Sequence, residues 1–161
     1  MLLVHGWNYR IWLADWAQLS VVDEFDFTTR KIYENFSNYS AWQRRAHLFV
    51  SYAREIGDIA SLLRNEVEMC RTAAWTEPAD QSVWFYQKWL FSELPKLIPE
   101  HAELLSKLQA EQIASIRELI VEEPSAALAH SFLLQFDAEY SVTHKLPEID
   151  PLRRAYWHSF K

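Results

Sequence analysis

The sequence predicts an all-α protein, an α-α superhelix in which antiparallel helical hairpins stack into a right-handed solenoid. A tryptophan motif recurs: Asn-Tyr-Ser-Ala-Trp at 38–42 is followed by Asp-Gln-Ser-Val-Trp at 80–84, and a shorter copy surrounds Trp7. Internal copies about 35 to 42 residues apart are typical of stacked helical units. Apolar residues recur every three or four positions, whereas the alternation typical of strands is absent.

Composition excludes several classes of function. The 161 residues include 16 basic and 22 acidic side chains, a net charge of -6 that disfavours nucleic acid as a partner. The two glycines, Gly6 and Gly57, are too few for a glycine-rich phosphate loop, a dinucleotide fingerprint or a nucleophile elbow. The single cysteine, Cys70, allows no disulfide framework. No signal peptide or membrane-spanning segment is evident, so we expect a cytoplasmic protein without membrane insertion.

The first predicted helix, 6–19, carries Trp7, Trp12 and Trp16. The chain begins almost at the first tryptophan copy, with no partner helix before it, so we expect a truncated N-terminus. These three side chains are then partly uncovered in the isolated chain. Either self-association or repeats that this chain lacks would cover them.

The second predicted helix, 21–36, is amphipathic. Its apolar side is formed by Val22, Phe25, Ile32 and Phe36. Its opposite side is predicted to face solvent, or alternatively a partner, and carries charged residues: Asp23, Glu24, Asp26, Arg30, Lys31 and Glu34.

The remaining helices are delimited by glycine, proline and capping residues. Gly57 ends a helix over 40–56, and Asp58 caps the next helix, which runs to about Thr76. A helix over 81–94 precedes an irregular link between Pro95 and Pro99. The later elements are helices over 101–123 and 125–140, a loop over 141–149, and a helix that begins at Asp150-Pro151.

These elements form one helical repeat domain, 1–161. Its copies lie near 1–19, 21–56, 58–97 and 100–140, and a C-terminal helix covers 150–161.

Each motif places a tryptophan just inside a helix start. Trp7, Trp42 and Trp84 are predicted to anchor the core between stacked helices, with ligand stacking as the alternative. Asn38 and Asp80 belong to polar turns that cap the helices of the second and third copies.

Arg10 and Arg45 follow the tryptophans of the first two copies by three residues. Ring and guanidinium therefore lie on one helical face, where stacking between them is possible. Gln87 takes this position in the third copy.

No self-contained active site is expected. The histidines lack the spacing of a metal site, so no metal is predicted, and Cys70 lies inside a helical pattern, where a buried thiol fills apolar space. The pattern indicates a helical interaction body without catalytic residues of its own. The histidines considered are His5, His47, His101, His130, His144 and His158.

The spacing Asn38-x-x-x-Trp42-x-x-Arg45 resembles the helix start that recurs in protein prenyltransferase α subunits. The segments at 35–48, 77–91 and 149–156 are most similar to the C-terminal part of the type II, or Rab geranylgeranyltransferase, α subunits. The resemblance covers nearly the whole chain.

This resemblance implies a prenyltransferase β subunit as partner, an α-α barrel that holds the catalytic zinc and the isoprenoid pocket. It further implies transfer of geranylgeranyl from geranylgeranyl diphosphate to C-terminal cysteines of Rab GTPases, which an escort protein delivers. We expect no cofactor on this chain and no activity without the β subunit.

The family also contributes a lysine to the diphosphate site from an early repeat, which this chain lacks. The resemblance places His5 near the lipid substrate; the alternative is an exposed histidine at the chain terminus. A non-catalytic helical-repeat scaffold that binds proteins is the alternative function.

Overall fold

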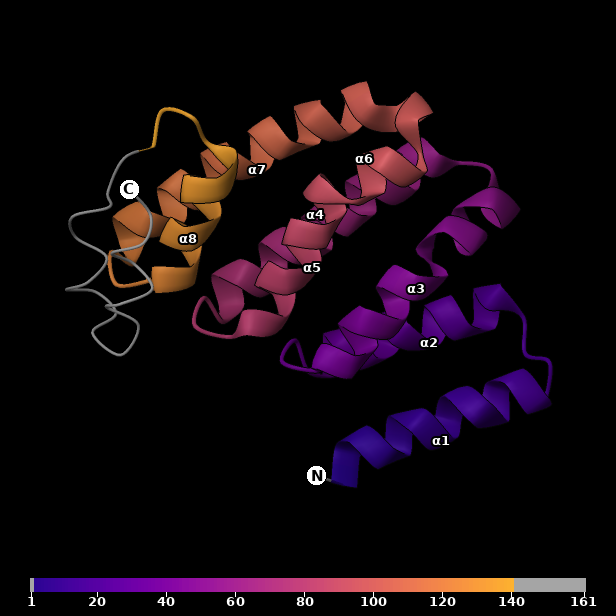
Figure 1. The fold of residues 1–161 in the computed structure, drawn as a ribbon. Coiled ribbons are helices and arrows are strands. Elements are labelled where there is room, and N and C mark those ends of the chain that lie inside the picture. The colour runs from indigo at the N-terminus through magenta and orange to yellow at the C-terminus, as the bar shows by residue number, and fades with distance from the viewer. Residues whose placement is uncertain (1, 141–161) are drawn as a thin grey trace.

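The computed structural model describes residues 2–140, which form helices and short connections and contain no strand (Figure 1). The predicted all-α superhelix is therefore confirmed for this part of the chain, whereas the predicted loop at 141–149 and helix at 150–161 lie outside it. The α-helices are α1 (Leu2–Trp16), α2 (Val21–Glu34), α3 (Tyr39–Ile56), α4 (Ile59–Thr76), α5 (Gln81–Ser92), α6 (Leu94–Leu97), α7 (Ala102–Glu122) and α8 (Ala127–Phe136).

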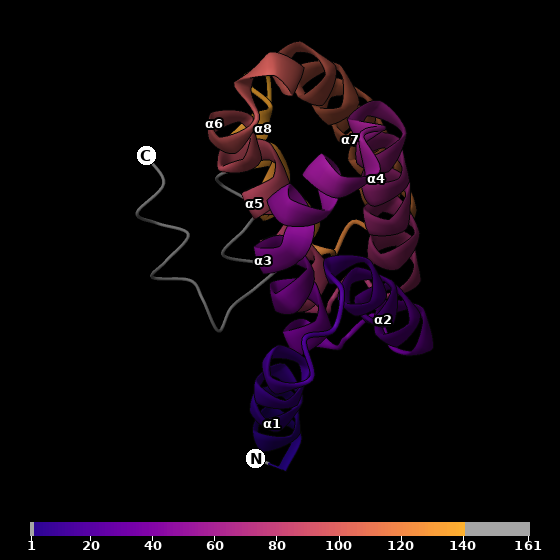
Figure 2. The same ribbon diagram turned by 90° about the vertical axis from the view of Figure 1, so that its right-hand side faces the viewer.

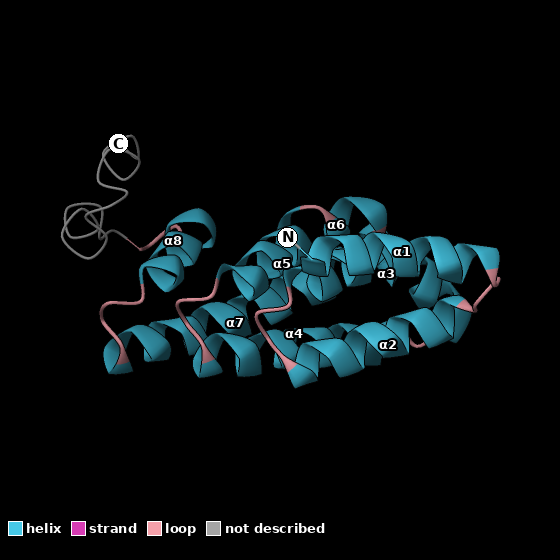
Figure 3. Ribbon diagram, turned by 90° about the horizontal axis from the view of Figure 1, so that it is seen from below, coloured by secondary structure: helices cyan, strands magenta, loops and turns pink. Residues whose placement is uncertain are grey.

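The longer helices form two layers, with α2, α4 and α7 in one and α1, α3, α5 and α8 in the other (Figure 3). Three hairpins, α2–α3, α4–α5 and α7–α8, are formed by helices that follow one another in the chain and pack together. Neighbouring hairpins meet where α3 packs on α5, α5 on α8, and α4 on α7. Each hairpin thus buries its apolar faces against the next one, as in a helical solenoid.

Side-chain caps fix where the helices begin. Asn38 Oδ1 accepts from the Ala41 amide at 3.2 Å, Asp58 Oδ1 from the Ser61 amide at 3.1 Å, and Asp80 Oδ1 from the Ser82 amide at 2.8 Å. Each cap satisfies an amide that lacks a partner within its own helix. The predicted caps at Asn38, Asp58 and Asp80 are confirmed.

The link around Pro95 and Pro99 differs from the prediction. Helix α5 ends at Ser92, and the short helix α6 and a 3-10 turn, η1 (Pro99–His101), occupy the segment predicted to be irregular. Proline lacks an amide hydrogen, but the first helical turn leaves its amides unpaired in any case. Both prolines lie in such first turns, so they begin helical segments here.

The charged side of α2 also differs from the prediction. Glu24 is buried, and its carboxylate contacts Arg10 of α1 and Arg44 of α3. It therefore joins three helices instead of facing solvent.

Candidate partner-binding groove and repeat motif

The repeat tryptophans anchor the hairpins. Trp42 and Trp84 are buried, and each indole Nε1 donates to the carbonyl oxygen of the residue six positions earlier. The distances are 2.8 Å from Trp42 to Phe36 and 3.0 Å from Trp84 to Pro78. Each ring thus fills the core and ties the helix to the turn before it, which confirms the predicted role of these two residues. Trp7 is half-buried and meets the Phe27 ring edge to face.

Sequence reasoning missed this motif in the fourth copy, where His130 replaces the tryptophan. His130 is buried in α8, and its Nε2 lies 2.9 Å from the carbonyl oxygen of Pro124, again six residues earlier. Because a carbonyl only accepts, Nε2 carries the hydrogen, and Nδ1 contacts the Tyr140 hydroxyl. The sequence feature that could have revealed the fourth copy is the dipeptide Glu123-Pro124, which matches Glu77-Pro78 before Trp84.

The motif arginines do not stack on the motif tryptophans. The Arg10 guanidinium carbon lies 3.3 Å from the centre of the Phe27 ring, and that of Arg45 lies 3.8 Å from the centre of the Phe25 ring. Both phenylalanines belong to α2. The possible stacking is not observed, because the arginines reach across to the neighbouring helix, where they lie over phenylalanine rings.

Arg45 forms the centre of a buried polar network. Its Nε donates to Glu66 Oε2 at 2.8 Å, and its Nη2 donates to Glu66 Oε1. Thr28 and Thr29 accept from Nη1 at 3.0 and 2.7 Å, and the Tyr86 hydroxyl donates to Glu66 Oε2 at 2.5 Å. The network joins α2, α3, α4 and α5.

Burial and charge shift the pKa values in this network. Burial lowers the pKa of Arg45, but the Glu66 carboxylate more than offsets this effect and keeps the guanidinium charged. Burial, reinforced by the negative charge of Glu66, raises the pKa of Tyr86 and of Cys70 well above their ordinary values. Cys70 is therefore a protonated, buried thiol that fills apolar space, as predicted.

The third copy has a neutral pair at the corresponding place. Gln112 of α7 donates through Nε2 to Gln87 Oε1 at 3.1 Å, and both side chains are buried. Arg10 with Glu24, Arg45 with Glu66, and Gln87 with Gln112 thus each join a motif helix to the next long helix in the chain.

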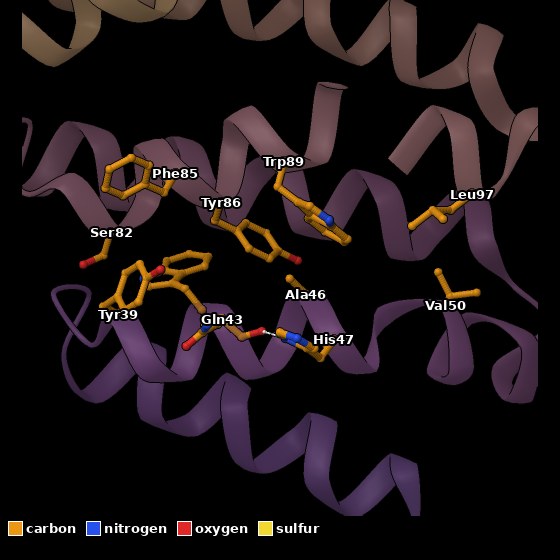
Figure 4. A pocket seen from close by; sticks show the side chains of 11 residues that line it. Tyr39, Gln43, Ala46, His47, Val50, Ser82, Phe85, Tyr86, Trp89 and Leu97 are labelled. Carbon is orange, nitrogen blue, oxygen red and sulfur yellow. Dashed lines mark hydrogen bonds between the residues drawn. The ribbon is translucent and has the colours of Figure 1, made fainter. Parts of the chain in front are cut away.

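An apolar groove of about 410 Å³ lies between α3 and α5 (Figure 4). Trp42 and Tyr86 are buried beside it, whereas Tyr39, Phe85 and Leu97 present exposed apolar surface. The remaining lining residues are Gln43, Ala46, His47, Val50, Ser82 and Trp89, so no carboxylate, lysine or arginine from the described part of the chain lines the groove.

The polar groups of this groove are largely engaged. His47 Nδ1 lies 2.8 Å from the carbonyl oxygen of Gln43, and the Ser82 hydroxyl donates to the carbonyl oxygen of Ser37 at 3.3 Å. The groove therefore offers aromatic and aliphatic surface with few free polar groups, a composition that suits the apolar side chains of a protein partner.

Three further predictions concern metal binding, membrane insertion and the place of His5. Among the described residues, no group of three or more His, Cys, Asp or Glu side chains could hold a metal ion. None of the described helices is long and apolar enough to cross a membrane. His5 lies in α1, but its side chain is outside what the structure describes, so its place near a substrate stays a prediction.

Paired helices in two layers, with a buried anchor near the start of α3, α5 and α8, define an α-α superhelical repeat protein. Residues 21–52 and 63–94 match the family described as protein prenyltransferase alpha subunit repeat. These segments lie in the α2–α3 and α4–α5 hairpins, which carry the groove and the Arg45 network.

The chain is similar to geranylgeranyl transferase type-2 subunit alpha from several organisms. It is 38% identical to the Saccharomyces cerevisiae protein over 92 residues, 53% of this chain and 28% of that protein. It is 28% identical to the Candida albicans protein over 151 residues, 71% of this chain and 41% of that protein. The match to the rat protein is 38% over 92 residues, or 16% of its length. The chain thus spans less than half of each of these relatives.

Proposed function

We propose that this chain is the α subunit, or a part of the α subunit, of a protein geranylgeranyltransferase type II and that it docks a catalytic β subunit. The observation that carries the proposal is the 38% identity to geranylgeranyl transferase type-2 subunit alpha over 92 residues. The prenyltransferase repeats in this region support it. In this role the chain acts in the cytoplasm and supplies a rigid helical surface.

The groove between α3 and α5 is the proposed docking site for the β subunit. Exposed aromatic side chains around a preformed apolar groove are typical of residues that dominate protein–protein affinity. Phe85 is 53% exposed and Trp89 is half-buried, so a partner would remove apolar surface from water at both positions.

The proposed reaction forms a thioether on a Rab GTPase delivered by an escort protein. The sulfur of a C-terminal Rab cysteine, as thiolate, attacks the first carbon of geranylgeranyl diphosphate; the carbon–oxygen bond breaks, and diphosphate leaves. The thiol proton passes to solvent. Zinc on the β subunit would lower the thiol pKa, while this chain would position the β subunit and, through His5, border the lipid.

The test is co-expression with the type II β subunit of the same organism, gel filtration, and a prenyl-transfer assay on the eluted complex. We expect the two chains to elute together and the isolated chain to transfer no geranylgeranyl group. Turnover by the isolated chain would contradict its role as a non-catalytic subunit.

Failure to elute with the β subunit would overturn the docking proposal and favour the non-catalytic scaffold. Elution together without turnover would retain docking and restrict the role of this chain to β-subunit binding. Replacing His5 by Ala in an active complex then tests the lipid contact through the KM for geranylgeranyl diphosphate.

A further inference from the structure

One face of α5 carries two aromatic and two polar side chains. Phe85, Lys88, Trp89 and Ser92 are spaced as i, i+3, i+4 and i+7, so they share one side of the helix. Phe85 is exposed and the other three are half-buried. Phe85 and Trp89 line the apolar groove toward α3 (Figure 4), whereas Lys88 and Ser92 contact α8.

A polar seam of four residues, Lys88, Ser92, Ser131 and Gln135, lies between α5 and α8. The Lys88 ammonium donates to the Ser131 hydroxyl at 3.3 Å, and the Gln135 amide donates to the Ser92 hydroxyl at 3.4 Å. No carboxylate of residues 2–140 forms an ion pair with Lys88. Its partial burial lowers the pKa of the ammonium.

The polar seam occupies the helix positions that form the apolar groove one copy earlier. These positions lie four and eight residues after the motif residue on the first helix, and one and five residues after it on the second. In the groove they are Ala46, Val50, Phe85 and Trp89, and in the seam they are Lys88, Ser92, Ser131 and Gln135. The groove and the seam are therefore neighbouring parts of one surface, which changes from apolar to hydrogen-bonding.

A partner that covers the groove rings also covers Lys88. Lys88 lies three residues after Phe85, and Ser92 lies three residues after Trp89, so each polar side chain adjoins one ring on the helix surface. An ammonium has three N–H donors, and the Ser131 hydroxyl accepts from one of them. Removing a charged group from water is costly unless an opposite charge pairs with it.

We propose that the docked β subunit places an aspartate or glutamate carboxylate against Lys88. The inference rests on the proposed function, since it takes the β subunit as the partner that covers the groove. No charged side chain of the described residues lines the groove, so the groove alone favours no single register. A charge pair at its edge fixes the register in which the β subunit lies along α5.

The affinity of the type II β subunit for variants of the full chain, measured by surface plasmon resonance, tests the proposal. We expect Lys88→Met to weaken binding about thirtyfold or more, because the carboxylate of the β subunit is left without its cation. Lys88→Glu should weaken binding further, since it opposes two negative charges. The matched control is Lys107→Met, which removes an exposed lysine from α7 in the other layer and should leave the Kd unchanged.

The outcomes separate this contact from the docking proposal. Circular dichroism shows whether each variant keeps its helices. Binding of Lys88→Met as tight as that of Lys107→Met, while Phe85→Ser weakens binding, would overturn the Lys88 contact and leave docking at the groove intact. Absence of binding by the natural chain would instead contradict the proposed function.

The ionisation of Lys88 provides a second measurement, which a purely structural role would not change. NMR of the chain with 13C-labelled lysine, assigned with Lys88→Met, reports the pKa of Lys88 in the free chain and in the complex. We expect a pKa below its ordinary value in the free chain and a rise in the complex, because a nearby carboxylate favours the charged ammonium. A pKa that stays low in the complex, or that is already raised in the free chain, would overturn the proposal.

Discussion

At the scale of single residues, Glu66 has the most demanding environment. Glu66 is fully buried, and its two carboxylate oxygens accept hydrogen bonds from Nε and Nη2 of Arg45. Its Oε2 also accepts a hydrogen bond from the Tyr86 hydroxyl. A buried charge is tolerated only while its partners are present, since an unpaired charge cannot recover its hydration. The network therefore makes α3, α4 and α5 depend on one another.

Removing one member of this ion pair should destabilise the protein strongly. We expect Glu66→Ala to lower the free energy of unfolding by about 3–5 kcal/mol, because it leaves the Arg45 guanidinium buried and unpaired. The double variant Arg45→Met/Glu66→Leu should lose less, since no charge remains buried. Urea denaturation measures both.

The control for this experiment is Glu68→Gln, which breaks only the surface pair with Arg71 and should leave stability nearly unchanged. A Glu66→Ala variant as stable as this control would show that Arg45 finds another partner or water.

The buried Cys70 thiol should make the folded protein less stable at alkaline pH. Burial, followed by the charge of Glu66, raises the pKa of this thiol in the folded protein. In the unfolded chain the thiol has a pKa of about 8.5. The folded state thus holds the proton more tightly than the unfolded state. The contribution of the thiol to the free energy of unfolding is therefore complete below that pH and declines as pH rises above it.

The measurement is urea denaturation between neutral and alkaline pH for the natural chain and for Cys70→Ala. We expect the decline that begins at the unfolded thiol pKa to be smaller in the variant. Equal pH profiles would mean that Cys70 ionises in the folded protein without cost.

At the scale of the elements, the copies preserve contacts while their residue types change. An indole in α3 and α5, and an imidazole in α8, each contact the carbonyl oxygen six residues earlier. Ion pairs in two copies correspond to an amide pair in the third. The geometry of the hairpin turn thus persists where a search for tryptophan and arginine alone fails.

The two glycines should respond in opposite directions to alanine. Gly57 ends α3 with φ at 74°, a left-handed conformation that a Cβ makes unfavourable. We expect Gly57→Ala to cost about 1 kcal/mol and Gly6→Ala, within α1 and with open space around its Cβ position, to gain about 0.5–1 kcal/mol. Thermal unfolding compares the two; the same sign for both would contradict this assignment.

At the scale of the whole molecule, α3 and α5 lie side by side (Figure 2), and the groove between them is the proposed β-subunit site.

A substitution in the groove should weaken association with the β subunit without unfolding the chain. We expect Phe85→Ser to weaken this association at least about tenfold, because the exposed ring is a candidate anchor whose loss leaves the core intact. Gel filtration of the co-expressed chains measures it, with Val121→Ser as the control. Unchanged association would place the β subunit elsewhere on the molecule.

Much of the fold was determined by the sequence alone. The recurrent tryptophan motif and helical periodicity predicted the all-α superhelix, and local caps such as Asn38 and Asp80 located helix starts. These features depend on residues close together in the sequence, so they can be recognised without knowledge of tertiary contacts. The positions of Trp42 and Trp84 in the core followed from the same pattern.

Only the tertiary structure decided which side chains from different hairpins meet. The partners of Arg45, the burial of Glu24, the groove between α3 and α5 and the matching role of His130 all depend on the packing of separate helices. Helical periodicity assigns a residue to a face but does not determine which helix covers that face. The physical reason is that packing free energy comes from contacts between segments distant in sequence, which local spacing does not encode.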